Sequence, residues 1–144
     1  GPGGGYYSLP VARMIGPTGH LTIVDIDQGM LDFTLARLRK HGLDTITDAV
    51  PCDVARLPFA EGSFETAFMV AVLGEVQDRQ AAVNELFRVL VPGGRLVVGE
   101  TPVDRHALHA EDLQRLARGA GFTDDGQVGG RLGWLIRFRR PNEG

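Results

Sequence analysis

Apolar residues along this chain follow two spacings, one typical of helices and one typical of buried strands. Between Asp27 and Gly42, leucines at positions 31, 35 and 38 lie on one helical face, with an aspartate to begin the helix and a glycine to end it. Residues 64–70 instead form a short run with apolar side chains on both faces, as a strand inside a parallel sheet requires. The same reasoning predicts helices at 5–15, 28–41, 79–90 and 110–120, and strands at 21–25, 46–50, 64–70, 95–100, 122–128 and 133–139.

Strands and helices alternate through most of the chain. This order predicts an α/β fold with a mostly parallel sheet and helices on both of its faces. The last two strands follow each other across Gly129-Gly130, which predicts an antiparallel hairpin at the C-terminus. Pro92-Gly93-Gly94 is expected to stop the third helix. Since no linker or repeat divides the 144 residues, we expect a single domain over 1–144.

Composition and charge exclude several classes of protein. The net charge is −3 and the pI about 5.8, so a nucleic-acid binder is not expected. The basic group Arg137, Arg139 and Arg140 is interpreted as a solvated strand end. No run approaches the ~20 apolar residues of a membrane span. Cys52 is the single cysteine, which fits a reducing compartment, and we expect a cytoplasmic protein without a metal site.

A glycine-rich loop, residues 1–5, precedes the first predicted helix. Glycines let the backbone approach a ligand closely, and a helix start offers free N–H groups, so Gly1 and Gly3 are candidate binding residues. A flexible leader or a protease-cleavage scar is the alternative. Asp25 ends the next strand, with Ile26 beside it, and its carboxylate can accept two hydrogen bonds from a ribose diol. An acid about 20 residues after a glycine loop favours ligand binding.

Two further strand ends carry candidates of the same kind. Asp53 can accept from the exocyclic amine of an adenine, while the N–H of Val54 donates to a ring nitrogen. The alternative for Asp53 is an ordinary turn residue. Val70 ends the strand 64–70 and could contact the amino-acid end of a ligand, although residues 69–71 taken singly are typical of a core.

Three motifs then occur in order: LPFAEGSFE at 57–65, VLGEVQD at 72–78 and ELFRVLVPGG at 85–94. They resemble the LPF-x-(D/E)-x-SFD, VLHHVPD and E-x-x-RVLKPGG motifs of class I S-adenosylmethionine-dependent methyltransferases, in the small-molecule group that includes ubiquinone- and menaquinone-pathway enzymes. Gly1-Pro2-Gly3 resembles the second half of the D-x-G-x-G-x-G cofactor loop of that class. The resemblance covers nearly the whole chain.

The resemblance implies a Rossmann-like sheet, S-adenosylmethionine as methyl donor and a small molecule as acceptor. Gly1 and Gly3 would then lie under the methionine part, Asp25 would hold the ribose, and Asp53 with Val54 would bind adenine. Ile26 and Val70 complete the expected cofactor-binding set. Two alternatives remain: a non-catalytic relative that acts as a binding or partner subunit, and a nicotinamide-dependent oxidoreductase, which would not account for the motifs at 57–65 and 85–94.

The chain departs from the family pattern at its start. The resemblance implies a central first strand before Gly1, and losing its buried side chains would cost on the order of 10 kcal/mol, as much as the whole stability of many domains. Three explanations are open: residues upstream supply this strand, another chain supplies it, or the arrangement is unusual. We favour the first. A partner subunit or a further segment should close the site, and a homo-oligomer is one such arrangement.

A second departure concerns residues that could act on the acceptor. Glu75 follows Gly74 where the family often has histidine, and it is a candidate base, with a solvated loop residue as the alternative. His106 and His109 are further candidates, with exposed loop histidines as the alternative, and Tyr6 and Tyr7 either line the cofactor pocket or pack the first helix. Because the cofactor carries the reactivity, no obligatory catalytic side chain is expected.

Overall fold

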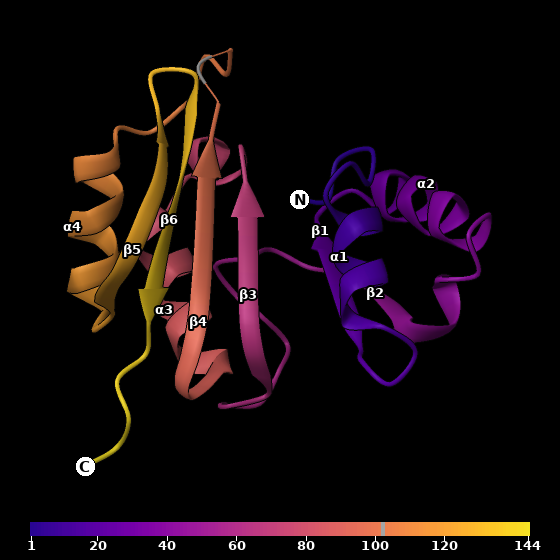
Figure 1. Ribbon diagram of the computed structural model, residues 1–144, viewed down its shortest axis with the longest axis horizontal. Helices are drawn as coiled ribbons and strands as arrows, with labels where there is room; N and C mark the ends of the chain where they lie inside the picture. Colours follow the sequence, from indigo (N-terminus) through magenta and orange to yellow (C-terminus); the bar gives the residue numbers. More distant parts are fainter. Residues whose placement is uncertain (102) are drawn as a thin grey trace. The chain divides into compact units, whose positions relative to one another are not determined.

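The structure, a computed structural model, describes residues 1–101 and 103–144 (Figure 1). The chain divides into two compact units, Gly1–Val54 and Ala55–Gly144. Each unit has its own sheet, with two strands in the first and four in the second. The expectation of a single domain over 1–144 stays a prediction.

The first unit is a parallel strand pair with two helices. It contains α1 (Ser8–Ile15), β1 (Leu21–Asp25), α2 (Gln28–Arg39), the short 3₁₀ helix η1 (Asp44–Ile46) and β2 (Thr47–Pro51), and β1 pairs with β2 in parallel. Asp27 begins α2 as predicted, because its carboxylate accepts a hydrogen bond from the N–H of Gly29 at 2.8 Å. The side chains of Ala12, Ile23, Leu31 and Leu38 are buried, so apolar faces of α1, β1 and α2 form this unit's core.

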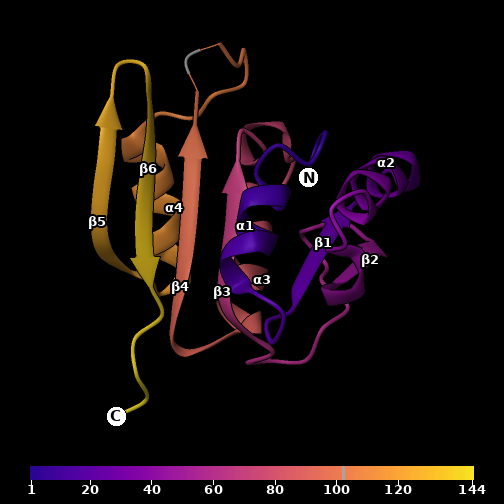
Figure 2. The same cartoon turned by 45° about the vertical axis from the view of Figure 1, so that its right-hand side comes forward.

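The second unit is a four-stranded sheet with two helices on one face, as Figures 1 and 2 show. Its elements are β3 (Phe64–Val70), the 3₁₀ helix η2 (Leu73–Glu75), α3 (Arg79–Val89), β4 (Leu90–Glu100), α4 (Ala110–Ala120), β5 (Thr123–Gly130) and β6 (Gly133–Arg139). The strand order is β3-β4-β6-β5, with β3 and β4 parallel and the other two pairs antiparallel. The predicted C-terminal hairpin is confirmed.

The core of this second unit is built from alternate residues of two neighbouring strands. In the antiparallel pair of β4 and β6, Leu96 lies opposite Phe138 and Val98 opposite Ile136. All four side chains are buried, whereas residues between them along the strands are more exposed. Alternation of this kind is expected where helices cover only one face of a sheet. Glu100 is the next residue of the same buried row.

Two sequence predictions about chain breaks are wrong. Pro92-Gly93-Gly94 does not separate a helix from a strand, because α3 ends at Val89 and β4 begins at Leu90. The segment is an irregularity within β4: the pairing with β3 shifts there, and Gly93 adopts a left-handed φ of 78°. The hairpin turn lies at residues 131–132, and Gly129-Gly130 ends β5. The glycines correctly indicated an irregular backbone at both places, but they did not show which element each place belongs to.

The interpretation of the terminal arginines as a solvated strand end is also wrong for Arg140. That side chain is 7% exposed and donates hydrogen bonds to the carbonyls of Phe87 and Leu90, at 3.0 and 2.7 Å. Its guanidinium also lies over the Phe87 ring, 4.7 Å from the ring centre. Arg140 therefore satisfies carbonyls at the end of α3, which have no partner within the helix.

Each of these sheets has two edge strands in the described part of the chain, among them β1 and β3. β1 pairs only with β2, and β3 pairs only with β4. The source of the strand expected before Gly1 stays a prediction. Within residues 1–101 and 103–144, no helix combines the length and the apolar character that crossing a membrane requires.

Candidate functional site

The glycine-rich loop is fastened to α2 through its own carbonyl groups. The Thr34 hydroxyl donates to the carbonyl of Gly3 at 3.0 Å, and the Arg37 guanidinium donates to that of Gly4 at 2.8 Å. Gly3 has a left-handed φ of 55°, and a Cβ added to it would meet no atom of the described residues within 4 Å. The loop therefore has a fixed course with open space beside it, which suits close approach of a ligand.

Asp25 lies at the carboxyl end of β1, where this loop returns. Its Oδ1 accepts a hydrogen bond from the N–H of Asp27 at 2.9 Å, and its Oδ2 lies 3.7 Å from the amine of Gly1. The side chain is 15% exposed. The N–H of Cys52 donates to the Asp25 carbonyl at 3.0 Å, which brings the end of β2 to the same edge. Gly1, Asp25 and the segment after β2 thus come together as the sequence predicted.

The neighbours of Asp25 offer both an apolar and a polar surface. Ile26 is 79% exposed, although an isoleucine next to a strand is usually buried. Asp53 is also exposed and Val54 is half-buried, while burial raises the pKa of the Cys52 thiol. An exposed apolar side chain at an edge that also carries Asp25 and Asp53 fits a ligand that has a flat ring and a diol. These residues of the first unit therefore fit a nucleoside-containing cofactor.

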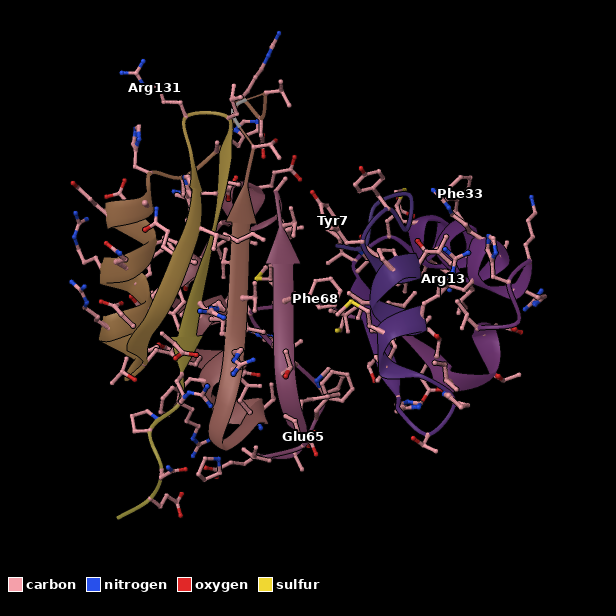
Figure 3. All side chains as sticks on the ribbon, viewed as in Figure 1. Tyr7, Arg13, Phe33, Glu65, Phe68 and Arg131 are labelled. Carbon is pink, nitrogen blue, oxygen red and sulfur yellow. The ribbon has the colours of Figure 1, made fainter. Side chains whose placement is uncertain are left out.

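Two tyrosines follow the loop in the first unit. Tyr6 is 73% and Tyr7 40% exposed, and their rings meet edge to face at 5.0 Å between centres. Figure 3 shows Tyr7 pointing away from α2, which carries Phe33. Neither ring is part of the buried core, and the choice between lining a cofactor pocket and packing the first helix stays open.

Val70, the remaining cofactor candidate, belongs to the second unit. It is half-buried at the end of β3 and is followed by Ala71, which has a left-handed φ of 55°. The Ala71 N–H donates to the carbonyl of Gly99 at 2.9 Å, which holds the turn in place. Non-glycine residues in this conformation are strained and gather at functional sites. The place of Val70 in the cofactor site stays a prediction.

The departure from the family pattern has a steric explanation at Gly74. A Cβ added to Gly74 would lie 1.8 Å from the carbonyl oxygen of His106, so the backbone after β4 fills the space that a side chain at 74 would need. Glu75, in η2, is exposed, as are the side chains of His106 and His109. Their roles toward an acceptor stay predictions.

The motifs at 57–65 and 85–94 meet in one structural ion pair. Arg88 donates from Nε and Nη2 to the two carboxylate oxygens of Glu85, at 2.7 and 2.9 Å. Glu85 also accepts from the N–H of Leu57 at 2.8 Å, and Arg88 donates to the carbonyls of Leu57 and Phe59, at 3.0 and 2.8 Å. The hydrogen bond from Arg88 is the main reason that the pKa of Glu85 lies below its ordinary value. The most specific motifs thus fix a loop of the second unit.

The sequence analysis missed Glu100, the last residue of β4. Its side chain is 3% exposed, and neither carboxylate oxygen has a regular hydrogen bond among the described residues. Burial, with the charge of Asp104 as the next cause, raises its pKa to about 7, while the N–H of Leu108 and the charge of Arg79 act in the opposite direction. The available signal was an acid at the end of an apolar strand.

Residues 1–98 match the methyltransferase domain family. The chain belongs to this family. The chain is 34% identical to a curated relative, the ubiquinone/menaquinone biosynthesis C-methyltransferase UbiE of Pseudomonas putida strain KT2440. The alignment of 147 residues covers 98% of this chain and 57% of that protein. The corresponding UbiE of Haemophilus ducreyi is 35% identical over 98 residues, covering 68% of this chain and 38% of the relative. The chain therefore spans between a third and three fifths of the length of these relatives.

Solved structures show the same fold at lower identity. A SAM-dependent methyltransferase from Aquifex aeolicus has a TM-score of 0.88 and 18% identity, covering 97% of this chain and 79% of that one. The [4+2]-cyclase SpnF has a TM-score of 0.88 and 22% identity, covering 99% and 74%. Geranyl diphosphate C-methyltransferase from Streptomyces coelicolor, in complex with S-adenosyl-L-homocysteine, has a TM-score of 0.82 and 17% identity, covering 97% and 68%.

These comparisons confirm the predicted family and the Rossmann-like α/β fold. They also confirm S-adenosylmethionine as the cofactor expected from membership of this family. The nicotinamide-dependent alternative is not favoured. The assignment of single residues, Gly1, Gly3, Asp25, Ile26, Asp53, Val54 and Val70, to the cofactor stays a prediction.

Proposed function

We propose that this methyltransferase-family chain carries methyl transfer from S-adenosylmethionine to a small molecule, and that the acceptor is a ring carbon of a hydroxylated quinone precursor. The observation that carries the proposal is the 34% identity to a quinone-pathway C-methyltransferase over 98% of this chain. The carboxyl edge of β1 and β2 supports it independently, because the residues there suit a nucleoside-containing cofactor.

Each candidate residue has a part in binding. The carboxylate of Asp25 would accept hydrogen bonds from the ribose hydroxyls, while the exposed side chain of Ile26 would lie against the adenine ring. Asp53 and the N–H of Val54 would bind the polar edge of that ring. The glycine loop, held on α2, would run under the methionine part at Gly1 and Gly3, and Val70 would contact the amino-acid end.

The cofactor, when bound, supplies an electrophilic methyl group, and the chain's task is to hold two molecules in line. Holding reactants in such a geometry can supply much of the rate enhancement without a reacting side chain. This agrees with the exposed positions of Glu75, His106 and His109.

Calorimetric titration of the full chain with S-adenosylhomocysteine tests the cofactor site. Asp25→Asn keeps an oxygen for the N–H of Asp27 but removes the charge and one acceptor. We expect the dissociation constant to rise roughly ten- to hundredfold, the range for a lost charged hydrogen bond. Asp32→Asn is the matched control, because Asp32 is exposed on α2 and accepts a hydrogen bond from Gln28 at 2.9 Å.

The alternatives give different results in the same assay. Absence of S-adenosylhomocysteine binding to the full chain contradicts the proposal, and binding of a nicotinamide dinucleotide instead points to the oxidoreductase. A chain that binds S-adenosylhomocysteine and transfers no methyl group to a demethylated quinol is the non-catalytic relative. Transfer of the methyl group to a ring carbon, seen by mass spectrometry of the product, supports the proposed acceptor class.

A further inference from the structure

The second unit contains a buried carboxyl group at the carboxyl end of β4. Glu100 continues the inward row of Leu96 and Val98 on β4, where the neighbouring positions carry aliphatic side chains. A buried charged group without partners is costly, so such a group is usually paired or absent. Both Glu100 oxygens lack a regular hydrogen bond among residues 1–101 and 103–144.

A half-open cavity of about 130 Å³ has Glu100 in its lining, and both carboxylate oxygens lie just beneath its surface, covered from solvent. It is lined by Glu100, Thr101, Ala107, Leu108, Gly130, Arg131, Gly133 and Trp134. Three elements contribute to it: the end of β4, the segment that leads to α4 and the β5–β6 hairpin. The volume is close to the roughly 150 Å³ of a cavity that holds one benzene ring.

Trp134 is placed to bind a flat ring there. It pairs directly with Glu100 in the register of β4 and β6. Side chains directly opposite each other in an antiparallel pair lie on the same face, about 5 Å apart at Cβ. Trp134 and Glu100 thus line the same cavity, and the Glu100 oxygens have no regular hydrogen bond among the described residues, an arrangement that suits an aromatic ring bearing a hydroxyl group.

Charged groups around Glu100 shift the pKa of its carboxyl group in opposite directions. Asp104, from the segment before α4, opposes its ionisation, and Arg79 of α3 favours it. Arg131 also lines the cavity, and Figure 3 shows its side chain at the hairpin tip, extending outward. With burial as the largest cause, the pKa is raised to about 7, the range in which a carboxylate is an efficient general base near neutral pH.

We propose that Glu100 binds a ring hydroxyl of the methyl acceptor in this cavity and takes its proton. The O–H bond of the acceptor breaks, an O–H bond forms on the Glu100 carboxylate, and the negative charge passes to the acceptor oxygen. The resulting phenolate has a more nucleophilic ring carbon. The catalytic part of this assignment rests on the proposed function, whereas the hydroxyl-binding part is a property of the cavity alone.

Phenol and anisole are the probes that separate hydroxyl recognition from simple apolar binding. Trp134 is the only tryptophan, so its fluorescence reports binding in this cavity directly. We expect the full chain to bind phenol roughly tenfold more tightly at pH 8 than at pH 6, because the ionised carboxylate accepts a stronger hydrogen bond. Anisole, which lacks the donor, should bind equally at both pH values.

Substitution of the carboxyl group completes the test. Glu100→Gln is expected to remove the pH dependence of phenol binding, whereas Glu65→Gln, on an exposed residue of β3, keeps it. Equal pH dependence for phenol and anisole in the unsubstituted chain overturns the proposal, as does unchanged phenol binding in Glu100→Gln. The measurements on the unsubstituted chain decide the matter even where Glu100→Gln does not fold.

The same samples titrated with S-adenosylhomocysteine distinguish this inference from the proposed function. Binding of S-adenosylhomocysteine without hydroxyl-dependent binding of phenol overturns the role of Glu100 alone. Hydroxyl-dependent binding of phenol without S-adenosylhomocysteine binding supports the hydroxyl site and contradicts methyl transfer.

Discussion

Replacement of Arg140 by methionine removes a buried guanidinium while keeping a long apolar side chain. In the structure, Nη1 lies 3.0, 3.2 and 2.7 Å from the carbonyls of Phe87, Arg88 and Leu90. Nη1 carries only two hydrogens, so we count two full hydrogen bonds. The contact of Nη2 with Glu61, at 3.1 Å, joins it to a side chain that is 68% exposed and adds little.

The expected cost follows from these contacts. Two hydrogen bonds to a charged donor contribute roughly 1.5 kcal/mol each at the low end of their range, and the position over the Phe87 ring adds about 0.5–1 kcal/mol. Water can replace part of this at the end of α3, so we expect Arg140→Met to lower the free energy of unfolding by about 3 kcal/mol. For a chain of this size the melting temperature should fall by on the order of 10 °C.

Thermal and urea unfolding followed by Trp134 fluorescence measure this cost, because Trp134 lies on the same strand, β6, that precedes Arg140. Arg137→Met is the matched control: it removes the same charge from an exposed position of that strand. We expect the control to change the unfolding free energy by less than about 0.5 kcal/mol. Equal effects of the two substitutions would refute the argument that the buried contacts, and not net charge, stabilise the end of α3.

Three further predictions concern other positions. The pKa of Glu85 is held below 4.5, so its ion pair with Arg88 stabilises the fold fully above that pH, and this stabilisation is lost as the pH falls through the lower native pKa. Urea unfolding from pH 7 to pH 3 should show the fall in stability, and the fall should be smaller in Glu85→Gln. Gly74→Ala should cost about 1–3 kcal/mol by the same assay, since its Cβ would meet the His106 carbonyl, whereas Gly130→Ala, whose Cβ meets nothing within 4 Å, should cost less than 1 kcal/mol. Burial raises the pKa of Cys52, so alkylation at pH 8 should be slower than for a free cysteine and slower again with S-adenosylhomocysteine; an unchanged rate on adding it contradicts a cofactor site at that edge.

Local patterns were sufficient to predict the elements, and long-range contacts decided the boundaries that were missed. α4 and β3 have the predicted limits, because the sequence that begins and ends them is local. β4 begins five residues before its predicted start, since pairing with β3 and with the segment around Arg140 carries the chain through Gly93 and Gly94 as a strand. Proline and glycine mark an irregular backbone, but only the neighbouring strand determines whether it is a break or a bulge.

The burial of Arg140 could not have been predicted from composition. Three arginines near a chain end are usually solvated, and Arg137 is exposed as expected. What distinguishes Arg140 is the end of α3, about fifty residues earlier, where carbonyl groups need donors. Sequence patterns do not report such distant pairs, so an interpretation by residue type alone was bound to treat all three alike.

The candidate site residues also divide into those that the sequence pattern predicted and those that depend on distant contacts. Asp25 and the segment after β2 were predicted to meet because parallel strands end at one edge, and the hydrogen bond between Cys52 and Asp25 places them there. Glu100 was missed because nothing local separates a buried acid from a solvated one at a strand end. Its surroundings come from the segment before α4, with Leu108, and from β6, with Trp134, and the local sequence around Glu100 does not report the β6 neighbour.

The most specific sequence motifs hold a loop in place, whereas the proposed acceptor contacts recognise the acceptor. This difference explains why the motifs did not identify the acceptor. Glu85 and Arg88 hold the loop at 57–59 through backbone carbonyl and N–H groups, so they would serve any acceptor equally. Chemical discrimination requires a polar group that is left unpaired when the wrong molecule binds. In the described part of the second unit, Glu100 is such a group, and a carboxyl group next to Trp134 discriminates by the presence of a ring hydroxyl. Acceptor choice in this chain should therefore change with substitutions around that cavity and not with substitutions in the family motifs.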